Sequence, residues 1–107
     1  VRCGLAERDL GRLGRAMEQS TLAMHACGMA AAPGLVYFRP PTLAAFNRVR
    51  ELRDQGIQVY ATMDAGAHVK AVCLANDAAS VADELRKVPG VLRTLTATPG
   101  PGVELTI

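Results

Sequence analysis

The chain has 107 residues, which is enough for one domain with a modest core but too few for a large two-lobed active site. Half of the residues are hydrophobic and only 4% are aromatic, so we expect a core of Ala, Val, Leu and Met side chains. The twelve basic and ten acidic residues are spread along the sequence without a basic stripe, which argues against a nucleic-acid-binding surface. No apolar run approaches the roughly 18 residues of a membrane span.

The three cysteines, Cys3, Cys27 and Cys73, are odd in number and lack the spacing of metal ligands. Two of them fall within apolar patterns, which predicts buried free thiols in a reducing, cytoplasmic environment and no metal site. Nothing in the sequence resembles a signal peptide. The chain starts with Val1 rather than Met and enters a helical pattern within a few residues, so we expect it to be a piece of a longer protein.

Residues 5–32 predict one long helix or two consecutive helices, because apolar positions recur at steps of three and four. Ser20-Thr21 could begin the second helix, and Gly14 with the other glycines of this region predicts the close approach of another element. His25 lies beside the apolar stripe and, taken alone, is more typical of a hydrogen-bonded packing residue than of a catalyst. The predicted buried face consists of Leu10, Leu13, Met17, Thr21 and Met24.

The next segment predicts a connection followed by a helix. Residues 35–38 lie between prolines and favour an extended connection or edge strand over a helix. Pro41 and Thr42 signal the start of the helix, and Gly56 signals its end. The predicted apolar face consists of Leu43, Phe46, Val49 and Leu52, while Arg48, Arg50 and Arg53 are expected to point largely to solvent.

Residues 57–64 alternate as a half-buried strand does. The core row is Ile57, Val59, Ala61 and Met63, and the polar row is Gln58, Tyr60, Thr62 and Asp64. Asp64 is followed by Ala65 and Gly66, where we expect a tight turn. Two interpretations stay open from the residues alone: a carboxylate that only begins a turn, and a carboxylate that works in a site. Residues 69–74 should return as the antiparallel neighbour of this strand.

The last third predicts a helix and two strands. Asn76 or Asp77 can cap the helix, whose inward positions are Ala78, Val81, Leu85 and Val88 and which ends near Pro89-Gly90. Residues 91–98 and 103–107 are expected to be strands, joined by a rigid turn at 99–102 that reverses the chain rather than cradling a phosphate. The order of elements predicts a single α+β domain over residues 1–107, with an antiparallel sheet covered by helices on one face.

Five short motifs carry a resemblance to a known family: LAMHA at 22–26, GLVY at 34–37, VRELR at 49–53, VYATMDAG at 59–66 and VK at 69–70. They resemble the C-terminal domain of diphosphomevalonate decarboxylase, a member of the GHMP kinase superfamily. Its members carry an LxMHA helix, a VRxLR-like helix and a YFTxDAGPNVK strand, and the match covers residues 20–72. The sequence departs from the family at Ala61, which replaces an aromatic residue, and at Ala67-His68, which replaces Pro-Asn.

The resemblance implies a ferredoxin-like two-layer sandwich and an ATP-dependent reaction. Mevalonate diphosphate would be converted to isopentenyl diphosphate, ADP, phosphate and CO2, as a step of isoprenoid biosynthesis. Asp64 would act as general base or orienting group for the 3-hydroxyl of the substrate, and Ala65, Gly66, Met24 and His25 would line the substrate. The family binds ATP and Mg²⁺ mainly in an N-terminal domain, which would be the partner of this chain, so the 107 residues alone are expected to be inactive.

Other functions stay open at this stage. The substrate could be a monophosphate or bisphosphate of mevalonate, or the protein could be a kinase without decarboxylation, although some of those relatives have lost the aspartate that Asp64 represents. A different class is a ferredoxin-like module that binds a small molecule or forms a homodimer. The sequence shows no Walker motif, GxGxxG fingerprint or nucleophile elbow.

Overall fold

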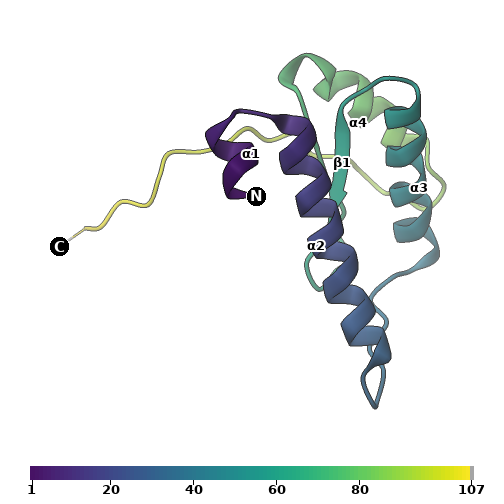
Figure 1. Cartoon of the computed structure of the whole chain (residues 1–107). Helices are drawn as coiled ribbons and strands as arrows, with labels where there is room; N and C mark the ends of the chain where they lie inside the picture. The colour runs from purple at the N-terminus through teal and green to yellow at the C-terminus, as the bar shows by residue number, and fades with distance from the viewer. Residues whose placement is uncertain (107) are drawn as a thin grey trace.

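The computed structural model describes residues 1–106 (Figure 1). In chain order the elements are α1 (Arg2–Ala6), α2 (Leu10–Ala30), α3 (Pro40–Asp54), β1 (Val59–Thr62), β2 (Lys70–Cys73), the short 3-10 helix η1 (Ala75–Asp77) and α4 (Ala78–Arg86). The strands form an antiparallel pair in which Tyr60 lies opposite Val72 and Thr62 lies opposite Lys70. The predicted α+β class and the predicted strand pair are therefore confirmed.

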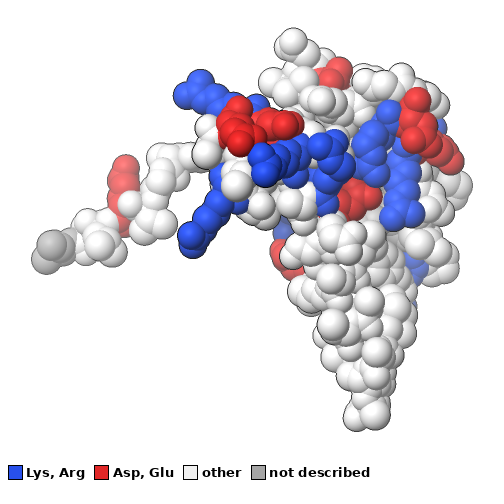
Figure 2. Space-filling model, viewed as in Figure 1, with Lys and Arg blue, Asp and Glu red and all other residues white. Residues whose placement is uncertain are grey.

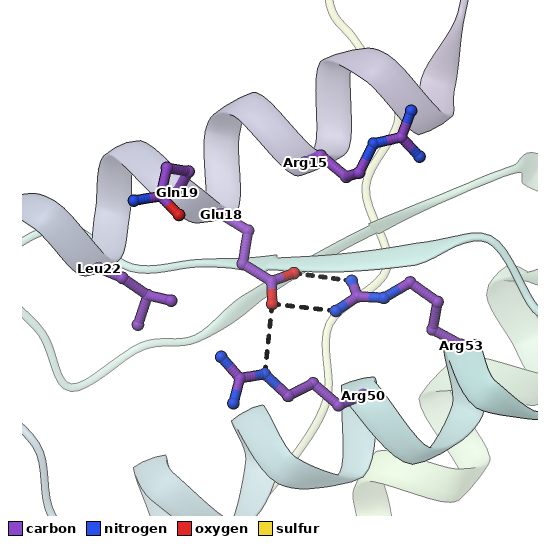
Figure 3. Close-up of a pocket in the computed structure, with 6 residues that line it drawn as sticks. All are labelled: Arg15, Glu18, Gln19, Leu22, Arg50 and Arg53. Carbon is purple, nitrogen blue, oxygen red and sulfur yellow. Dashed lines mark hydrogen bonds and ion pairs between the residues drawn. The ribbon is translucent and has the colours of Figure 1, made fainter.

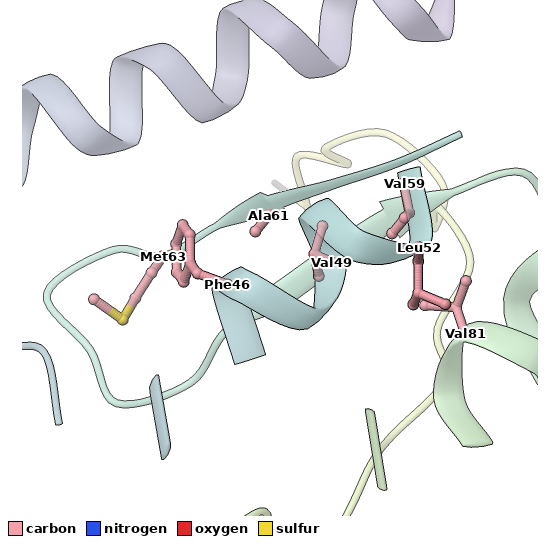
Figure 4. Packing of buried hydrophobic residues seen from close by; sticks show 7 residues of the cluster. All are labelled: Phe46, Val49, Leu52, Val59, Ala61, Met63 and Val81. Atoms are coloured by element: carbon pink, nitrogen blue, oxygen red, sulfur yellow. The ribbon is translucent and has the colours of Figure 1, made fainter. Parts of the chain in front are cut away.

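Strand β1 lies between helices α2 and α3, which contact it from opposite sides (Figures 1 and 4). The core row of β1 packs against α3, and the row that carries Tyr60 and Thr62 faces α2. Tyr60 is consequently buried, although the alternation of the sequence places it on the polar face. The prediction of helices on one face of the sheet is thus wrong, because both rows of β1 are covered.

The hydrophobic core is a cluster shared by α3, β1 and α4 (Figure 4). Its buried members are Phe46, Val49, Leu52, Val59, Ala61, Met63 and Val81. Helix α3 ends before Gly56, as predicted, and α4 buries Val81 as predicted. Leu43 was expected in the core but is 54% exposed, because Thr42 and Ala45 take the inward positions at the start of α3.

Helix α2 is one uninterrupted helix whose first turn is capped by Asp9, the side chain of which accepts a hydrogen bond from the amide of Arg12 at 2.9 Å. No second helix begins at Ser20-Thr21. The buried positions of α2 are Gly11, Gly14, Glu18, Thr21 and His25. This face shares Thr21 with the predicted one but otherwise lies one position further along, because α2 meets β1 through small residues and through polar groups that bond to the strand.

Replacing Gly14 by Ala should destabilise the chain by about 1–3 kcal/mol, because the added methyl group overpacks the contact between α2 and β1. A Cβ at this position would lie 2.1 Å from Cδ2 of the Tyr60 ring. Gly28 on the same helix is the matched control, since its Cβ would lie 3.8 Å from the nearest atom and Ala gains up to about 1 kcal/mol of helix propensity. Urea unfolding of both variants measures the difference, and equal effects would contradict the close approach.

The outer edge of β1 is closed by two side chains. Alternate residues of an antiparallel strand direct their N–H and C=O groups away from the partner strand. In β1 the amide of Ala61 donates to Glu18 Oε2 of α2 at 3.3 Å, and the carbonyl of Val59 accepts from Arg53 Nη1 of α3 at 3.0 Å. Glu18 and Arg53 also bond to each other, at 2.8 and 3.1 Å. An ion pair therefore takes the place that a further strand would occupy beside β1.

The two C-terminal strands predicted from the sequence do not form within the described residues. Residues 91–106 hold neither helix nor strand, and the chain runs away from the body of the domain without reversing at 99–102 (Figure 1). Leu92, Leu95, Val103 and Leu105 are each at least 80% exposed. Alternation alone cannot make a strand, because a strand needs a neighbouring edge to pair with. Ile107, which the prediction included, lies outside the described residues.

The surface of the lower end in Figure 2 carries no Lys, Arg, Asp or Glu. This end contains residues 19–38, a stretch without a charged side chain, and exposes Met24, Met29, Leu35 and Val36.

Among the described helices, none is both long enough and apolar enough to cross a membrane.

The cysteines are free, as the sequence predicts, but the prediction that they are buried is wrong for two of the three. Cys3 and Cys27 are exposed. Cys73 on β2 is partly buried, and burial raises the pKa of its thiol, with a smaller contribution from the negative charge of Asp77. A thiol with a raised pKa is largely protonated at neutral pH and a poor nucleophile.

Candidate active site

Asp64 opens onto a pocket between the C-terminal end of β1 and helix α2. The pocket has a volume of about 220 Å³ and its wall combines hydroxyl groups with thioether side chains. The lining residues are Val1, Met17, Ser20, Thr21, Met24, Thr62, Met63 and Asp64. Three hydroxyls and one carboxylate can bond to a polar ligand, and the methionines offer apolar surface to its carbon skeleton.

The Asp64 carboxylate is the only acidic side chain in this lining and is 85% exposed. Its Oδ2 accepts a hydrogen bond from Nζ of Lys70, the first residue of β2. The hydrogen bond and the charge of Lys70 hold the pKa of Asp64 below its usual range. The carboxylate is therefore ionised at neutral pH and can accept a proton or orient a hydroxyl group. The sequence analysis predicts no role for Lys70. The predicted hairpin, which places Lys70 opposite Thr62, is the signal that could have identified it as a neighbour of Asp64.

The two residues after Asp64 form an exposed turn. Gly66 has a φ of +121°, which L side chains rarely adopt, so glycine suits this position. A Cβ added at Gly66 would lie 3.4 Å from the Cβ of Tyr37. Ala65 and Gly66 thus lie beside the carboxylate as the sequence predicts, although neither is among the residues that line the pocket.

Met24 and His25 take different positions, although they are neighbours in α2. Met24 is 50% exposed and lines the pocket. His25 is only 4% exposed, does not line the pocket, and bonds through Nε2 to the backbone oxygen of Met63 at 3.2 Å. The structure therefore brings Met24 to the same pocket as Asp64 and places His25 behind the strand end that carries Asp64.

A second pocket, of about 270 Å³, surrounds the ion pair at the outer edge of β1 (Figure 3). It is lined by Arg15, Glu18, Gln19, Leu22, Arg50 and Arg53. Glu18 receives two hydrogen bonds from Arg53 and one from the amide of Ala61, and Arg50 approaches it at 3.6 Å.

The sequence prediction that Arg53 points to solvent is wrong. Besides bonding to Glu18, the guanidinium of Arg53 stacks on the Tyr60 ring, 4.7 Å from the ring centroid. Because these charged groups bond to one another and to the strand, we interpret the cluster as a structural contact that links α2, β1 and α3.

Glu18 should make the stability of the chain sensitive to acid. Burial alone would raise the pKa of Glu18, but the hydrogen bonds and charge of Arg53, with the Ala61 amide and Arg50, outweigh it and lower the pKa. A lowered pKa stabilises the fold fully above the unfolded value of about 4.3 and loses that contribution as the pH falls through the folded value. Glu18→Gln should therefore show a smaller loss of unfolding free energy below about pH 4 than wild type does. Chemical denaturation between neutral and acidic pH measures this, and parallel pH profiles would contradict it.

Among residues 1–106, no group of three His, Cys, Asp or Glu side chains is placed to hold a metal ion.

Comparison with known proteins relates this chain and its fold to one class of enzyme. No protein-family model matches the chain. The chain is 36% identical over 70 residues, or 64% of its length, to a phosphomevalonate decarboxylase of Haloferax volcanii. It superposes on mevalonate pyrophosphate decarboxylase from Streptococcus pyogenes with a TM-score of 0.75 and 38% identity over 79% of the chain. On mevalonate diphosphate decarboxylase from Enterococcus faecalis it superposes with a TM-score of 0.77 and 33% identity over 81% of the chain.

The α+β fold of this chain is thus shared with solved mevalonate diphosphate decarboxylases. The resemblance that the motifs predict is thus confirmed: the chain is similar to mevalonate diphosphate decarboxylases and is consistent with a C-terminal part of such a GHMP-type enzyme. It spans about a quarter of the length of these relatives, namely 27% of each of the two solved chains and 22% of the Haloferax protein.

Proposed function

We propose that this chain is the C-terminal part of an ATP-dependent diphosphomevalonate decarboxylase, which forms isopentenyl diphosphate, ADP, phosphate and CO2 from mevalonate diphosphate and ATP. The observation that carries the proposal is the ionised carboxylate of Asp64 at the mouth of a hydroxyl-lined pocket, in a chain similar to decarboxylases over about four fifths of its length. The chemistry of the residue fits, because phosphoryl transfer depends mainly on positioning and charge stabilisation.

In the proposed reaction, Asp64 orients the tertiary 3-hydroxyl of the substrate and accepts its proton. The hydroxyl oxygen forms a bond to the γ-phosphorus of ATP while the bond from that phosphorus to ADP breaks. The bond between carbon 3 and the phosphorylated oxygen then breaks to release phosphate, and the electron pair of the carbon–carboxylate bond forms the alkene as CO2 leaves. The lowered pKa of Asp64 makes it a weak base, so its orienting role is the larger one. Met24, Ala65 and Gly66 are the proposed substrate-lining residues.

The ATP and Mg²⁺ sites of the proposed enzyme lie mainly outside these 107 residues. The sequence holds no glycine-rich phosphate loop, and residues 1–106 show no carboxylate cluster for a metal. The pocket beside Asp64 is also smaller than the roughly 300–1,000 Å³ of a typical ligand site. We therefore propose an N-terminal ATP-binding domain as the partner that completes the site, a cytoplasmic location, and no turnover by the chain alone. The ferredoxin-like two-layer sandwich stays a prediction for the domain over residues 1–107.

One comparison favours a second substrate. The Haloferax relative is a phosphomevalonate decarboxylase, so a monophosphate of mevalonate is the alternative to the diphosphate. The replacement of the family's Pro-Asn by Ala67-His68, directly after the Asp64 turn, lies where such a difference in substrate would act.

The test is a product assay on the full-length protein with each mevalonate phosphate, following ADP and alkene together. Equal amounts of ADP and alkenyl product with the diphosphate would support the proposal, and the same products with the monophosphate would support the alternative. ADP without alkene would identify a kinase. No product with any substrate would overturn the enzymatic proposal in favour of a binding module or a homodimerisation domain.

A further inference from the structure

Three buried side chains on one face of α2 hold three consecutive residues, the last two of β1 and the residue that follows it. Glu18, Thr21 and His25 are each at most 6% exposed and bond, in that order, to residues 61–63. The contacts join Glu18 Oε2 to the Ala61 amide at 3.3 Å, Thr21 Oγ1 to Thr62 Oγ1 at 2.7 Å, and His25 Nε2 to the Met63 carbonyl at 3.2 Å. Asp64 follows Met63 in the sequence, so this series of contacts ends one residue before the proposed catalytic group.

The last contact is held in a defined orientation. A backbone carbonyl only accepts hydrogen bonds, so Nε2 of His25 carries the proton and donates to Met63. Two aromatic rings meet the imidazole edge to face: the centroid of Tyr37 lies 6.0 Å from that of His25, and the centroid of Phe38 lies 5.0 Å away. The ring of His25 is therefore fixed by packing as well as by its hydrogen bond.

Met63 is anchored on both of its sides. Its side chain is 1% exposed and packs in the core cluster (Figure 4), while its carbonyl is held by His25. The Asp64 side chain, by contrast, bonds within the described residues only to the exposed ammonium of Lys70. The position of the carboxylate over the pocket thus depends mainly on the backbone at Met63.

We infer that His25 is a positioning residue for Asp64: its hydrogen bond to the Met63 carbonyl fixes the peptide from which the carboxylate projects. The catalytic consequence rests on the proposed function, but the positioning itself is a property of this chain. His25 does not line the pocket and so acts on a substrate only through the strand end. A displacement of about 1 Å at a reacting group can lower a rate 10²-fold.

The first experiment compares His25→Leu, which removes the donor, with His25→Gln, which keeps an N–H donor, in the full-length protein. His25→Leu should lower kcat by about 10- to 100-fold with little change in KM, and His25→Gln should recover most of the rate. Leu85→Ala is the control, because it truncates a partly buried core residue on α4, away from Asp64. It should lower thermal stability while leaving kcat unchanged.

The second experiment does not depend on activity. Amide chemical shifts and hydrogen exchange of residues 64–66, measured in the 107-residue chain, should change in His25→Leu and return towards wild type in His25→Gln. If His25→Leu changes neither these amides nor kcat more than Leu85→Ala does, the inference is overturned. If the wild-type protein decarboxylates nothing, the proposed function fails, and the amide comparison still decides whether His25 positions Asp64.

Discussion

Replacing Asp64 by Asn in the full-length protein should lower kcat for both ADP and alkene formation by about 10²–10⁴-fold. Asparagine has nearly the same shape, but it cannot take the proton of the 3-hydroxyl and carries no charge to orient that group. The side chain is 85% exposed and its ion pair with Lys70 lies at the surface, so the unfolding free energy should change little. Steady-state kinetics with thermal unfolding separates the two effects.

Asp83→Asn is the matched control for this variant. Asp83 lies on α4, is 64% exposed and pairs with Arg86, so the substitution makes the same chemical change at a surface ion pair away from the pocket. Its kcat should equal that of wild type. An Asp64→Asn protein that keeps wild-type kcat would contradict the catalytic role and favour the interpretation of Asp64 as a turn residue.

Replacing Arg53 by Met should lower the unfolding free energy by about 3–5 kcal/mol, because it leaves the carboxylate of Glu18 buried without its main partner. The side chain of Glu18 is 8% exposed, and the carbonyl of Val59 loses a donor in the same substitution. Native proteins have only about 5–15 kcal/mol in total, so this loss removes a large share of the stability. Urea titration at neutral pH measures the loss.

Arg86→Met provides the comparison for Arg53→Met. Arg86 also pairs with an acid, but its side chain is 55% exposed, and exposed pairs of this kind contribute about 0–1 kcal/mol. If the two variants cost the same, Glu18 is not held mainly by Arg53, and Arg50 at 3.6 Å has taken over its charge.

The sequence predicted best where one physical signal decides the structure. The alternation of residues 57–64 placed β1 and put Asp64 at its end, and helix α3 followed from apolar spacing between a proline start and Gly56. Helix α2 shows the limit of that signal, because counting apolar residues favours Met24 over His25 as the buried position. The burial of His25 depends on a backbone carbonyl that only the folded chain brings near.

Two other features depend on contacts that periodicity does not contain. The strand pattern of residues 91–98 is regular, but a strand also requires a free edge, and nothing local reveals that Glu18 and Arg53 close the edge of β1. The approach of Lys70 to Asp64 likewise arises from the hairpin register rather than from either residue. The catalytic role proposed for Asp64 came from family motifs, and the structure adds that this side chain lines a pocket.

The closed edge of β1 also bears on how this chain behaves in concentrated solution. An open strand edge is a template on which a second molecule can add its own strand, and this is a common route to aggregation. Here the two backbone groups that a visiting strand would need first, the Ala61 amide and the Val59 carbonyl, are already bonded to side chains of the same molecule. The protection comes from within the 107 residues, so a newly made copy has it as soon as α2, α3 and β1 meet.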